Sequence, residues 1–175
     1  MKVLQLHARY RMAAGEDAVV DAEARALRRA GHVVEQYTVA NPTTVGASLV
    51  TLARSLHNGR VAEHVAAAID RVDPDVVHVH NTWFALSSAA VTAAGRCDRP
   101  VVATLHNFRL ACISTDLFRD GAVCTACVGR SPLPGVLHGC YRDSRSLSAV
   151  HAAELVSTRR RRVLERHVTT FVAPS

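Results

Sequence analysis

Residues 75–82 read DVVHVHNT, and this stretch decides the fold. A helical segment stops at Pro74 just before it, and Val76, Val77 and Val79 are typical of a buried strand, predicted at 75–80. Four further segments have the same character and are predicted strands: 2–7, 32–38, 101–105 and 169–173. Helical patterns separate the strands, at 16–30, about 43–57, 60–72, 84–95 and 146–167. Strands that alternate with helices predict crossover connections, a parallel sheet and a doubly wound α/β domain.

The segment 16–30 carries the clearest helix signals. Acidic residues open it and basic residues close it, as the helix dipole favours: Glu16, Asp17, Arg28 and Arg29. Gly31 follows and is expected to end the helix. Apolar residues at helical spacing predict the face that packs on the sheet: Val19, Ala22, Ala26 and Leu27.

Length and composition indicate one globular domain. A chain of 175 residues can bury roughly 70% of the surface that its unfolded form exposes. Its hydrophobic content of 49% and charged content of 21% are ordinary for a globular protein. The net charge of +6 comes almost entirely from arginine and favours phosphate-bearing or other anionic partners.

The sequence carries no targeting signal that we recognise. Met1 and Lys2 lead directly into a strand, without the pattern of a signal peptide. No apolar run approaches the ~18 residues that span a bilayer. We therefore expect a cytoplasmic location, with peripheral contact at the inner face of the membrane kept open, and thiols that stay reduced.

The periodic pattern stops between residues 107 and 145, where glycines and prolines interrupt an irregular cysteine-rich loop. Four of the five cysteines lie there with the spacing C-x11-C-x2-C-x12-C: Cys112, Cys124, Cys127 and Cys140. Four thiolates suit the tetrahedral coordination of zinc, so a structural zinc is the favoured interpretation. Two disulfides, or reduced thiols that pack as small apolar side chains, are the alternatives. A redox role is less favoured, because the C-x2-C lies in a loop and does not begin a helix.

Several short motifs occur in a characteristic order along the chain. They are KVLQLH at 2–7, GED at 15–17, DVVHVHN at 75–81, TLHN at 104–107 and FVAPS at 171–175. In this order they resemble the N-terminal domain of retaining glycosyltransferases with the GT-B fold, of the family-four type. The cysteine-rich loop, with RDG at 119–121 and HGCYR at 138–142, is similar to a bacterial subset of those enzymes. The resemblance covers nearly the whole chain.

The resemblance implies one half of a GT-B fold, a Rossmann-like domain spanning 1–175 that holds the acceptor. A second such domain would bind the nucleotide-sugar, and no segment of this sequence matches it. The chain stops directly after a strand, where this fold ordinarily adds a helix. We therefore expect a truncated enzyme whose C-terminal donor-binding domain is absent and which is inactive alone.

The implied reaction is transfer of a sugar, with retention, from a nucleotide-sugar to a hydroxyl acceptor. The acceptor would be a glycan, a lipid-linked sugar or a small molecule. Members of the family are thought to react on one face of the sugar, with the leaving phosphate assisting the incoming hydroxyl. The protein then contributes positioning and charge stabilisation, so neither a strong base nor a catalytic metal is expected.

Open parallel sheets bind ligands outside the carboxyl ends of their strands, and His106 follows a strand there. The resemblance implies that His106 lies against the transferred sugar, which makes it the candidate catalytic residue. Its alternative role is to cap the strand end through hydrogen bonds to the loop. Asn107, Asn81 and Thr82 would bind acceptor hydroxyls, and hydrogen bonds that stabilise the loops are the equal alternative.

Gly15, Glu16 and Asp17 start the first helix and are further candidates for ligand binding. A glycine lets a backbone amide approach a phosphate closely at a helix N-terminus. Relatives usually have two adjacent glycines here, whereas this chain has Ala14 before Gly15. The alternative is a simple turn in which the two acids cap the helix.

Other polar residues are assigned structural roles. His78 shares a strand face with His80 and is expected to be a hydrogen-bonded core histidine, and the ten histidines show no metal triad by spacing. Residues 159–162 are four consecutive arginines, and Arg159, Arg162 and Arg166 would share a helical stripe that is solvated or attracts anionic lipid headgroups. Nucleic-acid binding is not favoured, because no aromatic residues alternate with these arginines.

Two other functions compete with sugar transfer. A nucleotide-dependent oxidoreductase would carry G-x-G-x-x-G after its first strand, and this chain does not. A non-catalytic, zinc-ordered binding module of the same fold is the remaining alternative.

Overall fold

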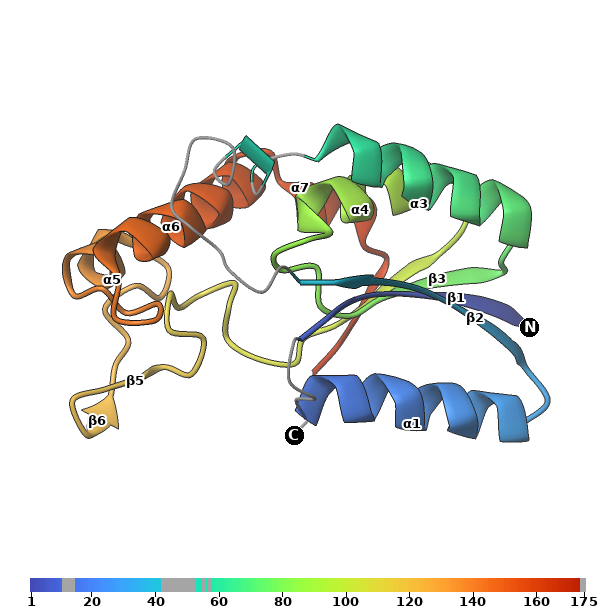
Figure 1. Cartoon of the computed structure of the whole chain (residues 1–175), viewed down its shortest axis with the longest axis horizontal. Coiled ribbons are helices and arrows are strands. Elements are labelled where there is room, and N and C mark those ends of the chain that lie inside the picture. Colours follow the sequence, from blue (N-terminus) through green and yellow to red (C-terminus); the bar gives the residue numbers. More distant parts are fainter. Residues whose placement is uncertain (11–14, 42–52, 55, 57, 174–175) are drawn as a thin grey trace.

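Five parallel strands form the central sheet of the computed structural model, which describes residues 1–10, 15–41, 53–54, 56 and 58–173 (Figure 1). The order is β2-β1-β3-β4-β7, and all four neighbouring pairs are parallel. The strands are β1 (Lys2–Arg9), β2 (Val33–Ala40), β3 (Val76–Val79), β4 (Val101–Thr104) and β7 (Thr170–Val172). The predicted doubly wound α/β fold is confirmed, with each predicted strand within two residues of its observed bounds.

Helices cover both faces of this sheet (Figure 1). One face carries α1 (Gly15–Arg29). The other carries α3 (Gly59–Val72), α4 (Ser87–Ala94) and α7 (Val163–His167). Asn58 caps α3 by accepting a hydrogen bond from the Val61 amide at 3.4 Å. The helix predicted at about 43–57 falls mostly outside the described residues.

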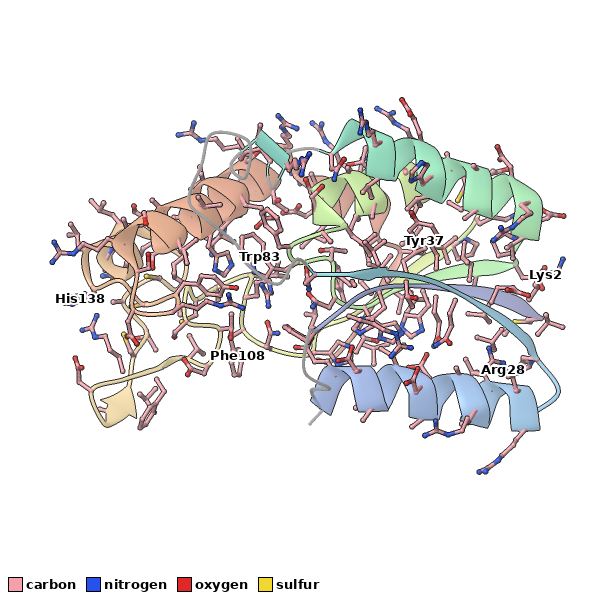
Figure 2. All side chains as sticks on the ribbon, in the orientation of Figure 1. Lys2, Arg28, Tyr37, Trp83, Phe108 and His138 are labelled. Atoms are coloured by element: carbon pink, nitrogen blue, oxygen red, sulfur yellow. The ribbon has the colours of Figure 1, made fainter. Side chains whose placement is uncertain are left out.

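The two faces of the sheet differ in polarity. Side chains alternate across each strand, so consecutive residues point to opposite faces. One face is apolar and packs against α3 and α4 through buried residues: Leu4, Leu6, Val77, Val79 and Val101. The other face, toward α1, carries a buried polar layer: Gln5, His7, His78, His80 and Thr104. Figure 2 shows the nitrogen- and oxygen-bearing side chains that fill the space between this face and α1.

The predicted packing face of α1 is only partly right, because Leu27 packs against a small core of Val3, Ala24 and Val34 while Val19, Ala22 and Ala26 are exposed. Val19 is 46% exposed, and the buried residues of this helix are instead Asp17, Val20 and Ala24. The reason is the polar layer, because α1 turns carboxylates toward the histidines of the sheet: Asp17 hydrogen-bonds His7, and Glu23 hydrogen-bonds Gln5. The acidic first turn and basic last turn are as predicted.

The helix predicted at 146–167 is two helices, α6 (Arg145–Arg160) and α7. Between them Arg162 has a left-handed backbone, with φ of 51°, and the turn there places Val163 in the core. The predicted arginine stripe is therefore wrong, because residues 159, 162 and 166 do not share one helix. Arg159 instead donates hydrogen bonds to the carbonyl oxygens of Leu110 and Arg130, at 2.6 and 3.2 Å.

The cysteine-rich loop lies beyond the carboxyl ends of the strands (Figure 1). It is not wholly irregular, since it contains the antiparallel pair β5 (Phe118–Arg119) and β6 (Ala122–Val123) and the short helix α5 (Leu133–Leu137). Ile113 anchors it to α6 in a small core with Ala152 and Leu155. Among the described residues, no helix is long and apolar enough to cross a membrane.

Candidate functional site

A hollow with about 530 Å³ of empty space, partly open to solvent, lies where β3 and β4 end. This is the edge at which open parallel sheets bind ligands. Its polar lining comes from α1 and from the loops after the two strands: Glu16, Asn81, Thr82, His106, Asn107 and Arg109, with His80 beneath them. The fold therefore brings together five predicted site residues that are separated by up to 91 positions in the sequence.

Two predicted site residues do not line this hollow. Asp17 is buried and its carboxylate contacts the His7 ring at 2.7 Å, inside the layer between α1 and the sheet. Gly15 opens α1, and a Cβ atom added there would meet nothing within 4 Å. Its neighbour Ala14 lies outside the described residues.

Asn107 links α1 to the loop after β4. Its amide nitrogen donates to Glu16 Oε1 at 2.6 Å, while its amide oxygen accepts from the Arg109 backbone at 3.0 Å. The other Glu16 oxygen, Oε2, is buried and has no hydrogen-bond partner among the described residues. A buried carboxylate oxygen in this condition is ready to accept a hydrogen bond from a ligand hydroxyl.

Arg109 was not predicted as a site residue, although it lies only three positions after His106. Its Nη2 donates to the Tyr10 hydroxyl at 3.2 Å, and its guanidinium lies 5.4 Å from the centre of the Trp83 ring. Its Nη1 is buried without a hydrogen-bond partner in the described part of the chain. Burial raises the pKa of Tyr10 to about 12, so Tyr10 stays a neutral phenol at neutral pH. In Figure 2, Trp83 lies between the sheet and α6.

His106 is held by its neighbour His80, whose Nδ1 lies 3.0 Å from His106 Nε2. Their rings stack with centroids 5.2 Å apart. Burial lowers the pKa of His106, so its imidazole is neutral at neutral pH and can both donate and accept a hydrogen bond. Both predicted roles are compatible with this geometry, because the ring lines the hollow and is also hydrogen-bonded at the strand end.

The polar layer under α1 contacts His80, which in turn hydrogen-bonds His106. His78 hydrogen-bonds Glu23 and Thr104, at 2.7 and 2.8 Å, so its prediction as a hydrogen-bonded core histidine is confirmed. Burial and the neighbouring His78 lower the pKa of His80 to about 3. Burial alone would raise the pKa of Glu23, but the bond from His78 and the charge of the histidines lower it, so Glu23 is ionised.

Asn81 uses both groups of its amide within the loop. Its nitrogen donates to the Ala8 carbonyl at 3.1 Å, and its oxygen accepts from the Trp83 backbone at 3.0 Å. These are the loop-stabilising contacts that formed one of its two predicted roles. Thr82 lines the hollow, and its backbone carbonyl accepts from Ser87 at 2.8 Å.

The four loop cysteines are free thiols, as is Cys97. Burial would raise the pKa of Cys112, but hydrogen bonds with the Ser114 hydroxyl and with the backbone of residues 114, 115 and 117 outweigh burial and lower that pKa. Burial raises the pKa of Cys140, and the charges of Cys127 and Cys112 add to the effect. Within the described residues, which include every cysteine, no three sulfurs lie within 4.8 Å of one another.

A parallel α/β sheet with a polar hollow at its carboxyl edge defines a ligand-binding domain of the Rossmann-like class. The profile of Glycosyltransferase Family 4 matches residues 15–175, and the chain belongs to this family. It is thus an N-terminal glycosyltransferase domain of the GT-B type. A search of curated proteins gave no match.

Proposed function

We propose that this chain is the acceptor-side domain of a retaining glycosyltransferase that transfers a sugar from a nucleotide-sugar to a hydroxyl acceptor. The observation that carries the proposal is the hollow at the carboxyl edge, where Glu16 Oε2 and Arg109 Nη1 lie beside His106 without hydrogen-bond partners in the described part of the chain. A sugar offers hydroxyl groups that both donate and accept, so it can satisfy a buried carboxylate and a buried guanidinium together.

In this proposal the residues of the hollow act by positioning. Glu16 accepts a hydrogen bond from one acceptor hydroxyl, and Arg109 donates to another oxygen. Neutral His106 donates to the transferred sugar and helps to stabilise the charge that develops in the transition state. Because the leaving phosphate assists the incoming hydroxyl, no strong base is required of the chain.

The donor would bind across the hollow on a second domain. We propose that residues 1–175 alone give no turnover, since the groups that hold the nucleotide are supplied from that domain. The membrane contact considered above would use the exposed Arg160, Arg161 and Arg162, each contributing ~1 kcal/mol near an anionic surface. Sedimentation with anionic vesicles, weakened by salt, is the expected signature of that contact.

The zinc proposal concerns the cysteine-rich loop. Cys112, Cys124, Cys127 and Cys140 provide the four thiolates of a structural zinc site, and the hydrogen bonds that lower the pKa of Cys112 favour its thiolate form. Zinc binding would bring the four sulfurs to the corners of one tetrahedron. The zinc would order the loop and take no part in sugar transfer.

The experiment compares the full enzyme, with its donor-binding domain, with its His106→Ala variant. We expect kcat to fall about 10²- to 10³-fold, as when an electrostatic donor is removed from a transition state, with a smaller change in KM. His64, exposed on α3, provides the matched control, and His64→Ala should leave both constants unchanged. Equal rates for His106→Ala and wild type, or sugar transfer by residues 1–175 alone, would contradict the proposal.

A further inference from the structure

A second cluster of metal-ligating side chains lies under α1, apart from the cysteine-rich loop. Glu23 from α1 faces His78 and His80 from β3 and its carboxyl end, and each offers one ligand atom within 4.8 Å of the other two. We propose that these three residues bind a divalent transition metal, with Zn²⁺ or Co²⁺ as the fitting class. Two imidazoles and one carboxylate are a donor set that such ions favour.

The spacing of the three atoms suits a shared ion. His78 Nδ1 lies 2.7 Å from Glu23 Oε1, and His80 Nε2 lies 3.8 Å from the same oxygen. Two ligands that each bind a metal at about 2.0–2.2 Å lie about 3.0–3.6 Å apart. Side-chain shifts of a few tenths of an ångström would therefore bring both nitrogens to ligand spacing from Glu23 Oε1, and the two nitrogens lie within 4.8 Å of each other.

His80 Nε2 supplies an independent sign of a missing ligand. His80 is 6% exposed, and this nitrogen is buried with no hydrogen-bond partner among the described residues. At 3.8 Å from the carboxylate it is too far for a hydrogen bond. If His80 Nδ1 carries the ring proton, Nε2 directs a lone pair toward a negative oxygen, and a cation between them satisfies both atoms.

The surrounding hydrogen bonds already resemble the outer shell of a metal site. The second nitrogen of each ring is held: His78 Nε2 by Thr104 Oγ1 at 2.8 Å, and His80 Nδ1 by His106 Nε2 at 3.0 Å. Gln5 donates to Glu23 Oε1 at 3.0 Å. Partners of this kind fix ring orientation and tautomer in metal-binding proteins.

The site would have one effect on the hollow above it. A metal on His80 Nε2 leaves the ring proton on Nδ1, so that His80 donates to His106 Nε2. His106 then carries its own proton on Nδ1. This consequence, unlike metal binding itself, rests on the function proposed for His106.

The experiment titrates the purified chain with Co²⁺ and records its visible spectrum. Nitrogen and oxygen ligands give d–d bands alone, whereas thiolates of the cysteine-rich loop add sulfur-to-metal charge transfer in the near ultraviolet. We expect one equivalent of cobalt that adds no charge-transfer intensity. Glu23→Gln should weaken this equivalent at least about tenfold. The matched control Glu63→Gln, on the exposed side of α3, should leave it unchanged.

If the wild-type chain binds cobalt only through thiolates, the proposal is overturned, and no variant is needed to show it. Equal affinity in wild type and Glu23→Gln does the same. A nitrogen-15 spectrum of the histidine rings checks the assignment, because Zn²⁺ should shift His80 Nε2 and His78 Nδ1. Shifts confined to other histidines would place the metal elsewhere and refute the site.

Discussion

Arg109 connects the hollow at the sheet edge to the buried side chains of α6. Its guanidinium is anchored by Tyr10 and Trp83, and its charge acts on two titratable residues of that helix. Burial, with the charge of Arg109 as the second cause, lowers the pKa of His151 to about 3. Burial raises the pKa of Glu154 to about 7, and both a hydrogen bond from Thr158 and the charge of Arg109 oppose this rise.

Glu154 makes stability depend on pH. Because the pKa of Glu154 is higher in the folded chain than in the unfolded one, the folded chain keeps a proton that the unfolded chain loses between about pH 4.5 and 7. The stability that the protonated Glu154 contributes is fully present below that window. It is lost as pH rises through the window. Glu154→Gln should therefore add about 1–3 kcal/mol to the free energy of unfolding at pH 8 and almost nothing at pH 4.5.

Urea unfolding of both proteins at the two pH values measures this difference. Glu165→Gln on α7 is the matched control, since Glu165 is exposed, and it should follow the wild-type profile. If Glu154→Gln and wild type lose stability in parallel with rising pH, the assignment to Glu154 fails.

For single residues, the sequence predicts where a side chain lies in the fold better than it predicts which side chains it contacts. The place of His106 after an apolar strand was enough to predict that it lines the hollow. The Arg109–Tyr10 and Glu23–His78 contacts were not predictable, because their members lie far apart in the chain and are charged or polar residues that most often face solvent. Only the folded arrangement of strands, loops and α1 brings them together.

Among the elements, α4 and α7 approach each other closely at Gly95. Gly95 ends α4, and a Cβ atom there would lie 2.3 Å from His167 Cβ. Two non-bonded carbon atoms do not come this close. Any larger residue at position 95 must therefore push α7 away. The opposite case is Gly59, which begins α3 with nothing within 4 Å of its Cβ position.

Gly95→Ala should destabilise the chain by about 1–3 kcal/mol, the usual cost of overpacking. Thermal unfolding is then expected about 2–4 °C lower for each kcal/mol in a protein of this size. Gly59→Ala should change stability little, or raise it by about 0.4–1 kcal/mol, because alanine restricts the unfolded chain. Equal melting temperatures for the two variants would show that α7 moves away from residue 95 with no loss of stability.

The ends of the helices, and the faces on which they pack, are only partly predictable from the sequence. Strong stop signals such as Pro74 placed the end of α3 correctly. The break between α6 and α7 falls within consecutive arginines, where no glycine or proline marks it, and is set by the burial of Val163. Most of the packing face of α1, apart from Leu27, was missed because apolar spacing does not reveal a helix that covers polar side chains.

At the scale of the whole molecule, the cysteine-rich loop is the part least supported by the sheet. It attaches through the small core of Ile113, Ala152 and Leu155, and its other large apolar side chains are often exposed, as Phe118 and Val123 are. A segment with so little buried apolar surface has few contacts to order it. This is the physical argument for a metal that closes the loop.

Metal analysis of the purified chain should find near one zinc bound by thiolates. A chelator should lower the melting temperature and speed proteolysis within residues 107–145, because the loop loses its cross-link. Cys124→Ser should abolish this zinc, whereas Cys97→Ser should not, since Cys97 follows α4 and lies outside the loop. A metal-free chain that folds and resists protease as well as the zinc-loaded one would contradict the proposal.

The contrast between the two faces of the sheet has a dynamic consequence. Water can replace the hydrogen bonds that hold α1 to Gln5, His7 and His78, but it cannot replace the aliphatic contacts of the larger apolar core beneath α3. Backbone amides of α1 should therefore exchange with deuterated solvent well before those of α3, through partial openings that leave the rest of the domain intact. Helix α1, which borders the hollow through Glu16, would thus open before the apolar side of the domain does.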